Sequence, residues 1–77
     1  MNKTAFLNEM ERMLQAGPKA LTGGESLDQF RNWDSMGILL FITLADESFG
    51  VTLSPKEITA CKTIDNLFDL ASSGNGR

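Results

Sequence analysis

The 77-residue sequence contains no histidine and no tyrosine, and it has a single cysteine. Without histidine, imidazole-based acid–base chemistry is excluded. One cysteine cannot form a disulfide within the chain or supply a cluster of thiolate metal ligands. A domain of this size buries roughly 60–65% of the surface of its unfolded chain, which leaves little room for a deep active site. The sequence therefore argues against an enzyme.

Basic residues are also scarce, since the chain has 7 of them against 10 acidic residues and a net charge of −3. Nucleic acids select for clustered lysine and arginine, so no nucleic-acid partner is expected. No apolar run approaches the ~20 residues of a membrane span, and the N-terminal segment lacks the apolar core of a signal peptide. We therefore expect a cytoplasmic, monomeric protein whose partners are proteins with basic surfaces.

The first half of the chain predicts one helix and one long loop. Apolar residues recur at helical spacing over residues 4–16, and Gly17 and Pro18 then end the pattern. Residues 19–33 show no sustained apolar stripe, which favours a long ordered loop containing a single helical turn. Three apolar residues at three-residue intervals are expected to anchor this loop on the core: Leu27, Phe30 and Trp33.

Capping signals predict three further helices. Asp34 is a favourable N-cap residue, and a strongly apolar segment follows it over residues 35–48. Residues 54–57, Ser-Pro-Lys-Glu, form a capping-box pattern with proline at the first helical position, so a short helix should run to about Ala60. Thr63 is expected to cap a last helix.

The resulting fold class is all-α, a small four-helix bundle with a long first loop and a short third helix. We expect the domain to cover residues 1–71 and the polar residues 72–77 to form a flexible tail. One apolar stripe of the second helix should face the core, with Phe41 beside it. This stripe consists of Ile38, Ile42, Ala45 and Phe49.

Ser35 is the residue with the most suggestive position for chemistry. It follows the capping Asp34, so its hydroxyl lies in the first turn of a helix, near backbone N–H groups without helical partners. These donors and the helix dipole favour a negative group, such as a phosphodiester on the Ser35 oxygen. A serine after an aspartate at a helix start is nevertheless common, so further context is required.

That context is a run of motifs in a fixed order. Residues 33–37, Trp-Asp-Ser-Met-Gly, resemble the signature at which acyl carrier proteins receive their prosthetic arm. Residues 49–51 resemble the end of that family's second helix, residues 53–58 its short third helix, and Thr63-Ile64 the start of its last. The resemblance to the acyl carrier family covers nearly the whole chain.

The resemblance implies a carrier without catalytic residues of its own. A phosphopantetheinyl transferase, also called holo-acyl-carrier-protein synthase, would move 4'-phosphopantetheine from coenzyme A onto Ser35. Asp34 would help to position the arm and to meet the transferase. The arm's thiol would hold acyl groups as thioesters and pass them among the acyl-transfer and synthase enzymes of fatty acid or polyketide-like biosynthesis. Magnesium belongs to the transferase reaction, so no resident metal is expected.

Two further sets of residues follow from the resemblance and from helical spacing. Partner enzymes would dock on a stripe that continues from Ser35: Met36, Leu40, Thr43 and Glu47. Plausible lining for the acyl chain consists of Ile42, Ala45, Ile58, Cys61 and Leu67, for which ordinary core packing is an equal alternative. The second helix is more apolar than in many relatives, and Leu44 on it is expected to be buried.

Several alternatives stay open. Cys61 is either a reactive thiol or, as its apolar neighbours favour, a small buried hydrophobe. Trp33 either shields the base of the arm or, preferably, anchors the loop on the bundle. The carrier could serve aminoacyl, D-alanyl or peptide synthesis instead. In a different class, the chain would be a helical interaction module that never receives an arm.

Overall fold

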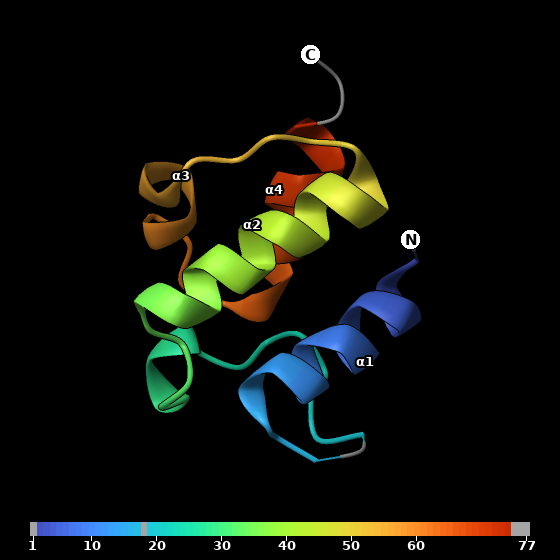
Figure 1. Cartoon of the computed structure of the whole chain (residues 1–77). Coiled ribbons are helices and arrows are strands. Elements are labelled where there is room, and N and C mark those ends of the chain that lie inside the picture. The colour runs from blue at the N-terminus through green and yellow to red at the C-terminus, as the bar shows by residue number, and fades with distance from the viewer. Residues whose placement is uncertain (1, 18, 75–77) are drawn as a thin grey trace.

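The computed structural model describes residues 2–17 and 19–74, and these residues form an all-α bundle. Its elements in order are α1 (Lys3–Leu14), a 3₁₀ turn η1 (Leu27–Gln29), α2 (Ser35–Phe49), α3 (Pro55–Thr59) and α4 (Ile64–Gly74). Helix α2 contacts each of the other three helices. Figure 1 shows α2 crossing the front of the molecule, with α4 behind it, α3 beside it and α1 along its lower side.

The predicted caps are present at the helix starts. The Asp34 carboxylate accepts a hydrogen bond from the Gly37 N–H at 3.1 Å. Ser54 and Glu57 form the complete capping box of α3, and the Thr63 hydroxyl oxygen accepts from the Asn66 N–H at 3.2 Å. These bonds satisfy backbone donors that the first turns would otherwise leave unpaired. The expected helix starts are therefore confirmed.

Two helix ends differ from the sequence prediction. Helix α1 ends at Leu14 because Gln15 adopts a left-handed conformation with φ of 56°. The sequence pattern over residues 4–16 predicted an end two residues later. Helix α4 continues to Gly74, and within it the Ser72 hydroxyl donates to the Phe68 carbonyl at 2.8 Å. Helix α4 therefore extends three residues beyond the predicted domain end at residue 71, while residues 75–77 of the predicted tail lie outside the described part.

Aromatic rings form the centre of the core. Phe6 of α1 is fully buried, and its ring makes edge contacts with Phe41 and Phe49 of α2, each at 6.0 Å between centroids. It also packs on Phe68 of α4 at 5.1 Å. Edge-to-face pairs of this kind add about 0.5–1.5 kcal/mol beyond the burial of area. Phe6 thus joins three of the four described helices.

The buried face of α2 is rotated from the predicted one. Gly37, Phe41 and Ala45 are the buried residues of this helix. Ile38, Ile42 and Phe49, which were expected to form the centre of the buried stripe, are only half-buried at its edges. The rotation follows from Phe41, whose ring is held between Phe6 and Trp33. Leu44, expected to be buried, is half-buried against the core.

The long loop is fixed by backbone pairing with the start of α4. The Leu27 N–H donates to the Lys62 carbonyl at 2.8 Å, and the Asp65 N–H donates to the Gly23 carbonyl at 2.8 Å. Ser26 and Thr63 form an isolated antiparallel bridge between these contacts. The loop is therefore held as an extended segment against α4 rather than as a free connection.

The three predicted loop anchors all contact the core. Leu27 in η1 is 2% exposed, while Phe30 and Trp33 are half-buried against the core cluster. The Trp33 ring meets the edge of Phe41 at 6.1 Å. Together they bring the end of the loop onto the bundle just before α2 begins.

Candidate functional site at the start of α2

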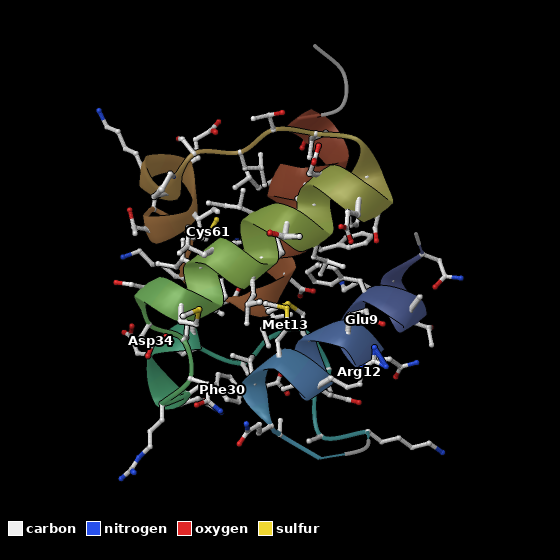
Figure 2. All side chains as sticks on the ribbon, viewed as in Figure 1. Glu9, Arg12, Met13, Phe30, Asp34 and Cys61 are labelled. Atoms are coloured by element: carbon white, nitrogen blue, oxygen red, sulfur yellow. The ribbon has the colours of Figure 1, made fainter. Side chains whose placement is uncertain are left out.

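Ser35 is the first residue of α2 and is exposed. The first helical bond of α2 runs from the Ile38 N–H to the Asp34 carbonyl, so the amides of Ser35 and Met36 precede the helical ladder. Asp34 is also exposed, and its carboxylate is engaged with the Gly37 N–H. Figure 2 places the labelled Asp34 at the outer end of α2, next to the turn that contains Phe30. The site is thus an accessible hydroxyl at a helix N-terminus.

Asn32, in the turn before Ser35, contacts both α1 and α2. The Asn32 side-chain amide donates to the Leu14 carbonyl at 3.2 Å, which satisfies a carbonyl at the end of α1. On the other side, a Cβ added to Gly37 would lie 2.4 Å from the Asn32 backbone oxygen. Only glycine permits this approach, so Gly37 allows the turn to lie directly on the first turn of α2.

An apolar surface adjoins the serine. Three large apolar side chains are exposed on the first half of α2, Met36 by 63%, Leu39 by 56% and Leu40 by 48%, and we call them the α2 apolar patch. Of the predicted docking residues, Met36 and Leu40 belong to this patch, and Thr43 and Glu47 are also exposed further along the helix. Leu39 was missed, although its position four residues after Ser35 places it beside the serine on a helix surface.

The residues proposed to line an acyl chain are packed rather than open. Ala45, Ile58 and Leu67 are fully buried, and Ile42 and Cys61 are half-buried. All five belong to the core cluster or pack against it. Burial and contact with the core cluster are compatible with ordinary core packing of these residues.

The Cys61 thiol donates to the Glu57 backbone carbonyl at 3.7 Å. Burial raises the pKa of Cys61, and the negative charge of Glu57 raises it further. Because the thiolate is the nucleophilic form, this environment disfavours reactivity. Figure 2 shows Cys61 beside α3, away from the labelled Asp34 at the start of α2. Cys61 therefore fits the structural alternative rather than a reactive site.

Hollows on the described surface lie at the end of α1 and beside the start of α2. One, of about 390 Å³, is lined by Asn8, Glu11, Arg12 and Gly17 on α1 and its end. The other, of about 210 Å³, lies between the end of α1 and the start of α2, and we call it the α1–α2 hollow. Its lining residues are Met13, Gln15, Asn32, Asp34, Met36, Gly37 and Leu40. This second hollow borders the residues on both sides of Ser35.

Comparison of the chain with protein-family models, curated proteins and solved structures gives no match. The function must therefore be argued from the residues themselves.

Among the described residues, none of the helices is both long and apolar enough to cross a membrane. Across residues 2–17 and 19–74, the cysteine and carboxylate side chains form no group that could hold a metal ion. What the start of α2 offers chemically is an exposed hydroxyl, nearby amide donors and an adjoining apolar surface. That combination suits covalent attachment of an anionic group with an organic tail.

Proposed function

We propose that the chain is an acyl carrier protein that holds a 4'-phosphopantetheine arm on Ser35. The observation that carries the proposal is the exposed Ser35 hydroxyl at the first position of a 15-residue helix, directly after a capping aspartate. An anion at this position meets unpaired amide donors and the positive end of the helix dipole, which contribute about 0.3–1 kcal/mol at an exposed site. The sequence resemblance gives this anion its identity.

Attachment is a phosphoryl-group transfer catalysed by a phosphopantetheinyl transferase. The Ser35 oxygen forms a bond to the phosphorus that carries the pantetheine, and the pyrophosphate P–O bond of coenzyme A breaks. Adenosine 3',5'-bisphosphate leaves, and the hydroxyl proton passes to the transferase. The carrier contributes an accessible oxygen and a helix end that accommodates the resulting negative charge.

The residues around Ser35 are compatible with such an arm. Its hydroxyl is exposed, so the transferase can reach the oxygen without opening the bundle. Asp34 directs its carboxylate to the Gly37 amide, which keeps the first turn of α2 fixed while the arm is added. When bound, the arm supplies a terminal thiol on which an acyl group is held as a thioester. The chain itself orients the attachment point.

The test is incubation of the full chain with coenzyme A, magnesium and a transferase of broad specificity, followed by intact-mass analysis. We expect a gain of one phosphopantetheine group, located on Ser35 by peptide mapping, and no gain in Ser35→Ala. Ser26→Ala is the matched control, because Ser26 is likewise an exposed serine at the start of a helical turn. An unchanged mass, or modification at another serine, would reject the carrier function.

The α2 apolar patch favours a second candidate, a helical interaction module. Exposed large apolar side chains gathered on one surface are typical of protein-binding sites. In that case Ser35→Ala would leave partner binding unchanged, whereas Leu39→Glu would reduce it. The mass experiment separates the two candidates, because an interaction module without an arm gains no mass.

A further inference from the structure

We propose that the pantetheine part of the arm lies in the α1–α2 hollow while the acyl cargo remains outside it. The inference rests on the proposed function and specifies where this chain would hold its arm. It differs from the sequence expectation, which placed the cargo among Ile42, Ala45, Ile58, Cys61 and Leu67.

The position of the hollow makes it accessible from Ser35. Asp34 and Met36, the two neighbours of Ser35 in the chain, are both part of its lining. Its far wall is Met13 and Gln15 at the end of α1. Figure 2 shows the labelled Met13 where α1 approaches α2. A tether fixed at Ser35 would therefore reach the hollow without crossing the bundle.

The lining matches the chemistry of pantetheine. The arm alternates methyl and methylene groups with two amides, and the hollow combines apolar Met13, Met36 and Leu40 with the amide side chains of Gln15 and Asn32. The Asn32 amide nitrogen already donates to Leu14. Its side-chain oxygen accepts no hydrogen bond from the described residues, so it is available to an N–H of the arm.

The size of the hollow limits what it can hold. Its volume of about 210 Å³ is below the ~300–1,000 Å³ of pockets that enclose drug-sized ligands, so it can take the part of the arm that adjoins Ser35 but not an acyl chain as well. The acyl group would consequently lie outside the hollow.

The experiment uses the full chain, loaded by the transferase and checked by mass, with ¹³C-labelled methionine methyl groups and an unlabelled arm. We expect nuclear Overhauser contacts from the arm's methyl groups to Met13 and Met36. Met10 is the internal control, since it is fully buried in the core and should show no contact. Loaded protein without these contacts, or with arm contacts to Met10 instead, would overturn the placement alone. Failure to load would instead reject the proposed function.

A pair of tryptophan variants tests the hollow directly. Leu40→Trp should fill it, because Leu40 lines the hollow and is 48% exposed, and the arm contacts to Met36 should be lost in the loaded protein. Thr4→Trp adds the same bulk at an exposed position near the other end of α1 and should leave the contacts unchanged. Arm contacts that persist at full intensity in Leu40→Trp would contradict the inference.

Discussion

The backbone oxygen of Asn32 lies so close to Gly37 that a Cβ on Gly37 would be 2.4 Å from it. Asn32 also donates its side-chain amide to Leu14, so one residue joins the end of α1 to the first turn of α2. The contact explains why a glycine occupies a helical position, where it costs about 0.5–1 kcal/mol relative to alanine. It fixes the backbone on which Ser35 is presented.

Gly37→Ala should therefore destabilise the protein. Forcing a methyl group against a backbone oxygen costs about 1–3 kcal/mol, and the better helix propensity of alanine returns about 1 kcal/mol. Because the clash is with a backbone atom at 2.4 Å, its cost lies in the upper part of that range, about 2–3 kcal/mol, and we expect a net loss of about 1–2 kcal/mol in urea unfolding. Gly24→Ala is the control, because no atom lies within 4 Å of its added Cβ. Equal stability of Gly37→Ala and the parent chain would show that the turn moves freely.

Substitutions of Asp34 should separate capping from charge. Asp34→Ala removes the acceptor for the Gly37 amide and should cost about 0.5–2 kcal/mol of unfolding free energy. Asp34→Asn retains an oxygen acceptor and should unfold within a few tenths of a kcal/mol of the parent. If the carboxylate also meets the transferase, Asp34→Asn will load more slowly despite its unchanged stability. Equal loading rates would limit Asp34 to capping.

Leu40→Glu should impair recognition without unfolding the chain. Leu40 is 48% exposed, so the variant is expected to keep cooperative unfolding. Its loading by the transferase should slow about fivefold or more, which corresponds to the loss of an apolar contact worth over ~1 kcal/mol. Thr52→Glu introduces the same charge at an exposed position outside α2 and should load normally. Loading rates that do not distinguish the two variants would count against a docking role.

The carboxylate of Glu25 should make the folding stability of the chain depend on pH. Burial acts to raise its pKa, but hydrogen bonds from Thr22 and Gly23 to the carboxylate outweigh this, so the pKa of Glu25 is lowered. A lowered pKa means that the ionised form stabilises the fold above the unfolded-state value of about 4.3, and that this contribution is lost as pH falls through the folded-state value.

The stability difference between the parent chain and Glu25→Gln should therefore shrink as the pH falls. We expect the parent to have the higher urea midpoint at pH 6, and the gap to narrow at pH 3. Glu47→Gln is a control on an exposed surface. A difference in urea midpoint that is the same at both pH values would exclude the Glu25 carboxylate as the source of the pH-dependent stability.

Cys61 should react slowly with alkylating reagents. Burial and the charge of Glu57 both raise the pKa of its thiol, so little thiolate is present at pH 7.5. Iodoacetamide should modify the folded chain much more slowly than the chain in urea. Glu57→Gln keeps a capping-box residue but removes the charge, and should modestly accelerate the reaction. Rapid labelling of the folded parent chain would mean that Cys61 is accessible as a thiolate.

Local signals were sufficient for the helix starts. Asp34, Ser54 and Thr63 each place an oxygen at a helix start, and each accepts the backbone hydrogen bond that its position predicts. Capping depends on a few adjacent residues, so it can be derived without the rest of the fold. The exposure of Met36 and Leu40 likewise followed from their positions relative to Ser35.

Tertiary structure decided which face of α2 is buried and what surrounds Ser35. Because α2 is apolar on most of its surface, the sequence periodicity is compatible with several buried faces. The contacts of Phe41 with Phe6 and Trp33 select the face that is buried. The α1–α2 hollow depends on Asn32 reaching Leu14, a contact between residues 18 positions apart. The sequence by itself thus determined where each helix begins and that Ser35 lies in the first turn of α2. Long-range packing determined what surrounds that serine, because such contacts have no signature in the local sequence.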